Sequence, residues 1–423
     1  MHIRSTMFTS LAALAALAAC GGDASSDSGG EFAGTVRDSA GVQIVDNSTD
    51  GLWAPEGGWT TEELLTIGEA AGDADYQFGQ IAAVDVLSDG RIAVLDQQAQ
   101  RVKIYGPDGT YEQSFGGPGN GPGEFSPGTI ALFVGRGDTI VVPDMGNQRV
   151  TVIPTEGEPT SFPLNMEQGI PVGFDISDRG VLVSQRRAVN FADPAARTEA
   201  DDLVLAQTYD GTILDTLLTP RRGGTFEMTS SGPRFTLFAA EPQWATLSDE
   251  RLAYASNDAY RISVYGPDGE LERIVTFPHE VQPVTGAEQE IVLDMVRASM
   301  ERSGAPPQAI DQMVGAMGFA DNWPAFARLR GGPHGTLWVQ RLRDLSDMSD
   351  DERDNWNPQL DQGGPIWDVF ESDGRYGGGV ELPARFTPFA LEEDRIYGVF
   401  RDDFDVQYVR VYALDTGPEP GDT

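Results

Sequence analysis

Residues 91–109 read RIAVLDQQAQRVKIYGPDG and contain the unit from which most of the chain is built. An apolar run at 91–96 is followed by a polar loop and by a run at 101–105 in which apolar and polar residues alternate. The unit ends in Asp108-Gly109, a pair that readily adopts the positive φ angles of a two-residue hairpin turn. A strand that is apolar on both faces is typical of a sheet packed between two other sheets.

The same unit recurs along the sequence. Further copies of the apolar run are TIVVPD (139–144), VLVS (181–184), RLAYAS (251–256), TLWVQ (336–340) and RIYGVF (395–400). Alternating runs follow at RVTVI (149–153), RISVY (261–265) and YVRVY (408–412), and further Asp-Gly turns lie at 210–211, 268–269 and 373–374. Six copies of a four-stranded unit predict an all-β fold, a six-bladed β-propeller.

The ring must also close. The last copy offers three strands, near 386–391, 395–400 and 408–414, before the chain ends in a Gly- and Pro-rich segment. An unpaired sheet edge invites aggregation, so its fourth strand must come from elsewhere. Residues 63–67, ELLTI, precede the first blade and are predicted to pair with the last one.

A family resemblance follows from the first two copies. Residues 114–125, SFGGPGNGPGEF, followed by Pro127 and by DMGNQRV at 144–150, resemble an NHL repeat. The chain as a whole resembles the six-bladed β-propeller lipoproteins of bacteria, closely in the first two blades and loosely from Val172 onward. The resemblance implies the fold, whereas propellers serve many unrelated functions.

The N-terminus has the pattern of an export signal. Arg4 precedes an apolar run at 11–19 that is too short to span a bilayer, and the run ends at Cys20, the only cysteine of the chain. Residues 17–20, LAAC, resemble the lipobox of bacterial lipoproteins, which implies diacylation of the Cys20 sulfur, as with palmitate, and stable membrane anchoring. With Gly21 rather than aspartate next to it, the resemblance favours the outer membrane. The expected location is therefore the bacterial cell envelope, with the domain outside the cytoplasm.

These observations divide the chain as follows: a signal peptide at 1–19, a flexible tether at 20–40, the propeller at 41–416 with a helical insertion at 284–320, and a disordered tail at 417–423. No stretch of the sequence indicates a second domain.

Charge narrows the possible partners. The chain has 66 acidic against 29 basic residues, a formal net charge of −37. Nucleic acids and anionic membrane surfaces are bound through Lys and Arg contacts to phosphate, so neither is an expected partner. The membrane is expected as a partner only through the lipid on Cys20.

Arginines nevertheless gather in the loops of one predicted face. In a propeller, the loops joining second to third strands and the connections between blades share a face. The candidate ligand-binding residues there are Arg186, Arg187, Arg221, Arg222, Arg341, Arg343 and Arg401, and Arg234, Arg328 and Arg330 are placed in the connections between blades. The planar guanidinium suits carboxylates and phosphates. The alternative is that these arginines pair with acidic residues of the same loops, such as Asp344, Asp402 and Asp403.

One insertion has helical periodicity. Thr285 and Glu288 form a capping box, and two runs of apolar residues at helical spacing flank SGAPP at 303–307. Four of the ten methionines lie here, which suits packing against the body, a lid or a docking surface. Since the insertion joins the fourth and fifth blades, it is expected over the arginine-bearing face.

Signals for catalysis are weak. Of the three histidines, His2 lies in the signal peptide, and the other two, His279 and His334, cannot build a three-histidine catalytic zinc site. A structural zinc site would need cysteine or more histidine, and no Gly-x-Ser-x-Gly elbow is present. Acidic residues cluster in the loop 344–363, but without the spacing of an EF-hand. No cofactor is therefore assigned, and Ca²⁺ stays an option.

The sequence thus favours a non-enzymatic binding or scaffold module for an anionic small molecule, peptide or glycan, or for an envelope protein. The alternative is a calcium-dependent propeller enzyme, a lactonase-like hydrolase or a lyase, using carboxylates in the central channel.

Overall fold

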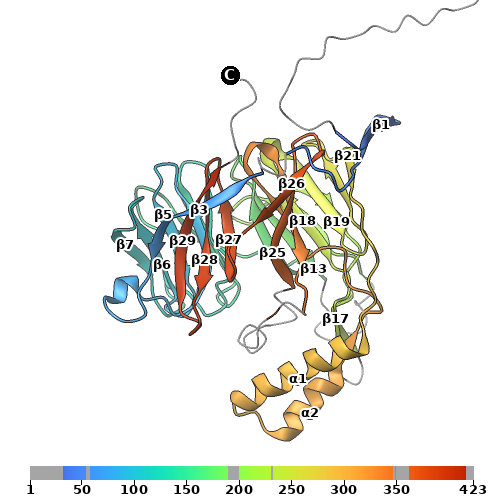
Figure 1. Cartoon of the computed structure of the whole chain (residues 1–423). Coiled ribbons are helices and arrows are strands. Elements are labelled where there is room, and N and C mark those ends of the chain that lie inside the picture. The colour runs from blue at the N-terminus through green and yellow to red at the C-terminus, as the bar shows by residue number, and fades with distance from the viewer. Residues whose placement is uncertain are drawn as a thin grey trace, which may run out of the picture.

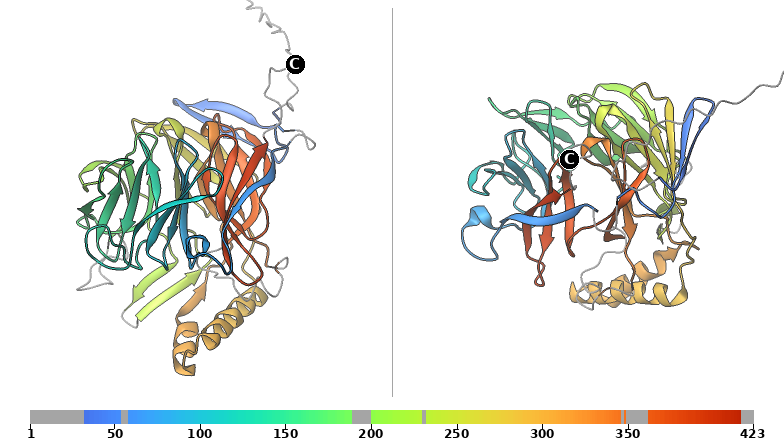
Figure 2. Two further views of the ribbon diagram at one scale, coloured as in Figure 1. Left: turned by 90° about the vertical axis from the view of Figure 1, so that its left-hand side faces the viewer. Right: turned by 45° about the horizontal axis from the view of Figure 1, so that its top comes forward.

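The computed structural model describes residues 32–53, 58–188, 200–229, 232–345, 348 and 362–415. Its sheets confirm the predicted six-bladed propeller, with six antiparallel four-stranded units arranged side by side around a common axis (Figures 1 and 2). Cys20 and the acidic residues 347, 350–352 and 354 lie outside the described residues.

Each blade is a meander that runs outward from the axis. Blade 1 contains β4 (Ile81–Val86), β5 (Ile92–Asp96), β6 (Arg101–Tyr105) and β7 (Tyr111–Gly116). Blade 2 contains β8 (Phe133–Gly135), β9 (Thr139–Asp144), β10 (Arg149–Ile153) and β11 (Thr160–Pro163). Blade 3 contains β12 (Ile170–Ile176), β13 (Leu182–Arg187), β14 (Leu203–Gln207) and β15 (Ile213–Leu218).

The second half repeats the pattern. Blade 4 contains β18 (Pro242–Thr246), β19 (Leu252–Ser256), β20 (Arg261–Tyr265) and β21 (Leu271–Thr276). Blade 5 contains β23 (Arg328–Gly331), β24 (Leu337–Leu342), β25 (Gly363–Phe370) and β26 (Tyr376–Glu381). Blade 6 contains β27 (Phe386–Leu391), β28 (Arg395–Arg401), β29 (Gln407–Asp415) and β3 (Thr60–Ile67).

The predicted closure of the ring is confirmed. β3 pairs antiparallel with β29 from Thr60↔Asp415 to Ile67↔Val409, so an N-terminal strand completes the last blade. The predicted Asp-Gly pairs also lie in hairpin turns, and Gly109, Gly211 and Gly269 have φ angles between 78° and 85°. The aspartates are not at positive φ, and the turns are longer than the predicted two residues, since Tyr105 pairs with Tyr111. The glycines of the turns and the apolar pattern of the sequence therefore both match the observed propeller.

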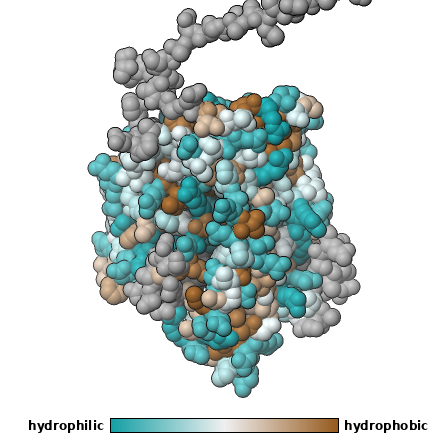
Figure 3. All heavy atoms as spheres, turned by 45° about the vertical axis from the view of Figure 1, so that its right-hand side comes forward, coloured by the Kyte–Doolittle hydropathy of each residue, from teal (hydrophilic) through white to brown (hydrophobic). Residues whose placement is uncertain are grey.

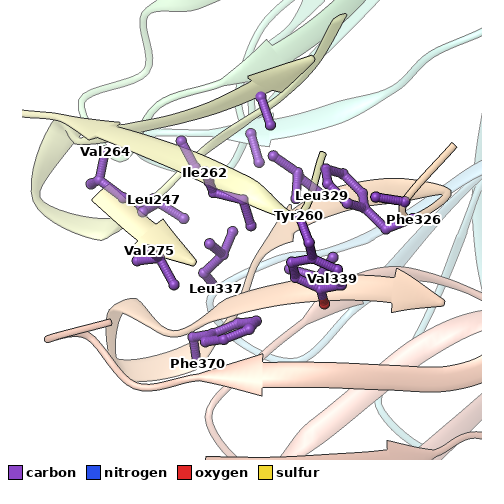
Figure 4. Close-up of a cluster of buried hydrophobic side chains, with 14 of the residues drawn as sticks. Leu247, Tyr260, Ile262, Val264, Val275, Phe326, Leu329, Leu337, Val339 and Phe370 are labelled. Carbon is purple, nitrogen blue, oxygen red and sulfur yellow. The ribbon is translucent and has the colours of Figure 1, made fainter. Parts of the chain in front are cut away.

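Contacts between blades form the core. All five residues of β5 are buried, as expected for a strand packed between neighbouring sheets. Between blades 4 and 5, Ile262 and Val264 pack near Leu337 and Val339 in a cluster that also contains Phe370 (Figure 4). The cluster between blades 3 and 4 is smaller, with three fully buried members, Val183, Val204 and Leu252.

The N-terminal segment differs from the prediction. A flexible tether was expected to reach residue 40, but β1 (Thr35–Ser39) pairs with β2 (Val42–Asp46), which lies parallel to β21 at the outer edge of blade 4. This edge is available because the meander leaves its fourth strand unpaired on one side. Ala40 and Gly41, both at positive φ, form the turn between β1 and β2.

The helical insertion is confirmed as a hairpin of α1 (Gly286–Arg302) and α2 (Pro307–Ala316), with the Thr285–Glu288 capping box in place. An unexpected small sheet supports it: β16 (Phe226–Thr229) pairs with β17 (Gly232–Leu237), which pairs in parallel with β22 (Met317–Phe319), directly after α2. A cluster around Phe238, Val292 and Trp323 holds helices and sheet together. The hairpin projects beyond one end of the propeller (Figure 1).

Short 3₁₀ turns occur at Ala74–Tyr76, Ser248–Glu250 and Pro333–Gly335. None of the helices in the described part of the chain is long and apolar enough to cross a membrane. On the face that Figure 3 presents, apolar residues form small separate patches among hydrophilic ones, in keeping with the acidic composition.

Candidate site in the central channel

The first strands of the six blades enclose a cavity of about 740 Å³ along the propeller axis. Its wall includes parts of β4, β8, β12, β18, β23 and β27, so every blade contributes. We call the end from which these strands start the loop face, because the connections between blades and the loops from second to third strands lie there. Near that end the wall carries two exposed apolar side chains, Ile130 and Val172, with exposed fractions of 51% and 42%.

One layer of the channel wall is charged in alternate blades. Asp85, Asp175 and Arg330 stand at equivalent positions of blades 1, 3 and 5, each opposite the second residue of the neighbouring second strand. Equivalent positions in the intervening blades carry apolar residues, namely Phe133, Ala245 and Ala390. All six residues line the cavity. We call Asp85, Asp175 and Arg330 the charged ring.

Main-chain groups of its own strand and of the next blade hold the Asp85 carboxylate in place. It accepts hydrogen bonds from the N–H of Val86 at 2.8 Å and from the N–H of Val134, in β8, at 2.6 Å. Burial raises the pKa of Asp85 to about 7, partly opposed by these two hydrogen bonds, while the negative charges of Glu392 and Asp175 add to the rise. This carboxyl therefore changes charge near neutral pH.

Asp175 has an equivalent arrangement two blades away. Its carboxylate accepts from the N–H of Ile176 at 2.9 Å and from both the N–H and the hydroxyl of Thr246, in β18, at 3.1 and 2.7 Å. Burial raises the pKa of Asp175, although the hydrogen bonds from Thr246 and the positive charge of Arg330 oppose the rise. Both carboxylates of the charged ring are thus fixed by neighbouring backbone.

Arg330 is the cation of the charged ring and has few partners. Its Nη1 donates to the carbonyl oxygen of Phe389 at 3.0 Å. Its guanidinium carbon lies 5.9 Å from the centroid of the Phe389 phenyl ring. Its Nε has no hydrogen-bond partner among the described residues. Burial lowers the pKa of Arg330 to about 10, with Arg328 adding to the effect and Asp175 and Asp85 opposing it. No carboxylate of the described residues forms an ion pair with it within 4.0 Å.

Unlike Arg330, most of the predicted loop-face arginines are bound to several protein groups. Arg186 is the first example. Only 2% of this residue is exposed, and its guanidinium donates to Ser184 Oγ, to the carbonyl oxygen of Asn165 and to Gln207 Oε1. Burial lowers the pKa of Arg186 to about 10. Its hydrogen bonds link β13 to β14 and to the connection between blades 2 and 3, so the geometry does not favour a ligand-binding role for this side chain.

Three further arginines are paired with carboxylates, although none of the partners is Asp344, Asp402 or Asp403, the residues that the alternative interpretation names. Arg187 binds Asp202 at 2.7 Å and Glu241 at 3.3 Å. The guanidinium of Arg341 binds buried Asp368 at 2.7 Å, and exposed Arg401 binds Asp405 at 2.8 Å. Asp368 also accepts hydrogen bonds from the hydroxyls of Tyr260 and Tyr376.

The remaining predicted arginines do not enter the channel wall. Arg222 donates to the carbonyl oxygen of Ala188 at 3.3 Å, Arg343 donates to that of Gly363 at 3.2 Å, and both make further interactions. Arg221 is exposed. Of the seven predicted residues, Arg187 alone lines the cavity.

Two placements in the connections between blades were wrong. Arg328 and Arg330 belong to β23, the innermost strand of blade 5, and both line the cavity. Arg234 does lie in the connection between blades 3 and 4, as predicted, where it belongs to β17 of the small sheet. The apolar run TLWVQ predicts a blade strand, whereas the shorter strand Arg328–Gly331 before it has no such run and resembles a connection in sequence.

A polar network forms the wall near the loop face. Trp244 Nε1 donates to Gln185 Oε1 at 2.9 Å, and Gln185 Nε2 donates to Asp202 at 2.7 Å. Glu241 accepts from the N–H of Thr225 at 2.8 Å. Together with Arg187, these groups orient a set of fixed donors and acceptors around the channel entrance.

The sequence interpretation missed Asp85 and Asp175, although a signal was present. Both are charged residues inside an otherwise apolar strand, in VDVLSD (84–89) and FDISD (174–178), at the same distance before the next strand of the blade. A buried charge repeated at one position of a repeat is a candidate site. Within the described residues, no group of three or more His, Cys, Asp and Glu side chains is placed to hold a metal ion.

No protein-family model matches the sequence, and no curated protein is significantly similar to it. Among solved structures, a protein described as exported, from Bacteroides fragilis, is 10% identical with a TM-score of 0.48 over 87% of this chain and 99% of that one. A virginiamycin B lyase from Staphylococcus aureus is 11% identical, with a TM-score of 0.40 over 84% and 99%. A gluconolactonase from Xanthomonas campestris is 12% identical, with a TM-score of 0.41 over 84% and 98%. The chain is therefore similar to bacterial β-propeller proteins, and no activity is transferred from them.

Proposed function

We propose that this chain is an envelope binding module that takes a small polar molecule into its central channel through the loop face. The observation that supports the proposal is the cavity of about 740 Å³, bounded by all six blades and lined by fixed polar groups. Pockets of this size with a few placed polar groups are typical of small-molecule sites. The loop-face arginines contribute to the framework of the entrance, since most of them already bind protein partners.

Lipid anchoring at Cys20 in the outer membrane belongs to the same proposal. The LAAC sequence and the absence of other cysteines support it. Metabolic labelling with an alkyne fatty acid tests it: label incorporation should disappear in Cys20→Ala. Labelling that persists in this variant would contradict anchoring through that sulfur.

Binding in the channel is tested by a thermal-shift screen of polar metabolites, sugars, amino acids and peptides. A ligand present at 100 times its Kd stabilises the folded state by about 2.7 kcal/mol. Val172→Trp should abolish the shift, because this exposed residue lines the cavity and a larger side chain fills it. Leu214→Trp is the matched control, since Leu214 is 55% exposed and lies on outer strand β15.

A ligand whose thermal shift is equal in wild type and Val172→Trp would place binding outside the channel. A complete screen without any shift would leave the scaffold role as the better interpretation, with the helical hairpin as the contact surface.

A second candidate function is acid–base catalysis, favoured by one observation: the pKa of the Asp85 carboxyl is raised to about 7, in a position that lines the channel. A group that titrates near neutral pH is suited to proton transfer. In this case Asp85→Asn should abolish turnover of a bound hydrolase or lyase substrate while its Kd changes little. Turnover that survives the substitution would exclude Asp85 as the acid or base.

A further inference from the structure

We propose that the charged ring selects a zwitterion, a free amino acid or short peptide whose ammonium group meets Asp85 and Asp175 and whose carboxylate meets Arg330. This inference rests on the proposed function and adds the chemical class of the ligand. It is carried by the alternation of charges around one layer of the channel, together with the incomplete pairing of each charge.

Among the described residues, Arg330 has no anionic partner within 4.0 Å. A guanidinium has five N–H donors, and the structure gives this one a single hydrogen bond, to the Phe389 carbonyl oxygen. Charges withdrawn from bulk water are normally paired, because an uncompensated one is costly. A ligand carboxylate would supply the planar, bidentate acceptor that the guanidinium fits best.

Asp85 and Asp175 can bind the ammonium group of the ligand. Their oxygens accept backbone and hydroxyl hydrogen bonds, and a carboxylate has about four acceptor positions, so both retain capacity for further donors. No lysine or arginine of the described residues forms an ion pair with either carboxylate within 4.0 Å. An ammonium group with three N–H donors can bridge two carboxylates.

The order of charges around the axis explains why the ligand needs both an ammonium group and a carboxylate. Each member of the charged ring is separated from the next by one blade with an apolar residue at that position, so two sides of the channel carry a carboxyl group and one carries a guanidinium. Above the pKa of Asp85, about 7, two sides are negative and one is positive. A simple anion attracted to Arg330 is repelled by two aspartates, and a simple cation is repelled by Arg330. A zwitterion satisfies all three.

The cavity also leaves room beyond the charges. Its volume of about 740 Å³ exceeds that of a single amino acid, and the wall toward the loop face carries Trp244 and Gln185. A side chain or second residue of the ligand would extend toward these groups.

Calorimetric titration of the purified full chain with L-alanyl-L-alanine tests the proposal, with the N-acetylated and C-amidated dipeptides and the free amino acids as the comparison set. The unmodified dipeptide or an amino acid should bind, and removal of either terminal charge should weaken binding about tenfold or more. Equal affinity for capped and uncapped forms would overturn the proposal.

Arg330→Gln should exchange the preferences. The amide can still donate to Phe389 O, but the positive charge is lost, so dialanine should bind about tenfold more weakly while the cationic C-amidated dipeptide binds more tightly than to wild type. Arg401→Gln, an exposed arginine outside the channel wall, is the control and should change neither affinity. A parallel loss in Arg401→Gln would contradict a role specific to Arg330.

The two proposals fail in different ways. If another molecule binds and is blocked by Val172→Trp, while dialanine and all free amino acids fail to bind wild type, the zwitterion proposal is wrong and the channel proposal stands. If nothing tested binds in a manner that Val172→Trp blocks, both are wrong.

Discussion

The loop face and the central channel both carry arginines, but these differ in whether they have protein partners. On the loop face, Arg187, Arg341 and Arg401 each bind a carboxylate, and Arg186 is buried among neutral acceptors. In the channel, Arg330 has one hydrogen bond and no close carboxylate among the described residues. Arginine-rich loops in a strongly acidic chain therefore mark internal pairing, whereas the less conspicuous arginine of an inner strand has capacity for a ligand.

The largest effect should come from removing a buried partner of a loop-face arginine. Asp368 is 1% exposed and holds Arg341, Tyr260 and Tyr376. Asp368→Ala leaves these donors without an acceptor and should lower the free energy of unfolding by about 3–5 kcal/mol. Urea denaturation measures this change.

The matched comparison is Arg401→Gln, which breaks an exposed ion pair of similar length and should cost less than about 1 kcal/mol. Equal losses in the two variants would contradict the claim that burial distinguishes these pairs.

Arg186→Met should have the next largest effect. Methionine fills much of the volume of the arginine stem, but Ser184 Oγ, the Asn165 carbonyl and Gln207 Oε1 lose their donor. The expected loss is about 2 kcal/mol of unfolding free energy, since the regained desolvation energy of the guanidinium offsets part of it. The Kd of any channel ligand should stay unchanged, and a large change in Kd would restore Arg186 as a binding residue.

How far the sequence predicts this structure differs between the ring and the site. The strands, the Asp-Gly turns and the closure by residues 60–67 were predictable, because apolar periodicity and turn chemistry are local and repeat along the chain. The pairing of Arg341 with Asp368, 27 residues away across two strands, depends on register and was not visible. The same holds for Asp85, whose partner Val134 is 49 residues away in another blade.

An effect of similar size, but dependent on pH, is expected for Asp85. Because the pKa of Asp85 is raised to about 7, the folded state binds this proton more tightly than the unfolded chain, so the contribution stabilises the fold at low pH and is lost as pH rises through about 4 to 7. The free energy of unfolding of the wild type should therefore fall by about 2 kcal/mol more than that of Asp85→Asn between pH 4 and 8. This figure allows for screening of the Asp85 charge by water in the channel.

The charged groups that act on Asp85 in the channel are Asp175, Glu392 and Arg330. Asp215→Asn, at an exposed position of β15, is the control and should follow the wild-type curve. Parallel pH curves for wild type and Asp85→Asn would show that the Asp85 carboxyl has an ordinary pKa.

The smallest effect is expected for the exposed arginines of the loop face. Arg221→Gln and Arg401→Gln together should change the Kd of a channel ligand by less than about twofold, since surface charges are screened by physiological salt. Calorimetric titration at two salt concentrations measures this. A loss of about tenfold or more would return the site to the loop face.

The most direct measurement of the central claim is the position of bound L-alanyl-L-alanine in a crystal structure of the protein. The account predicts ligand density on the propeller axis, with the amino group between Asp85 and Asp175 and the carboxylate at Arg330. Density on the loop face beside Arg221 or Arg401, with an empty channel, would contradict it.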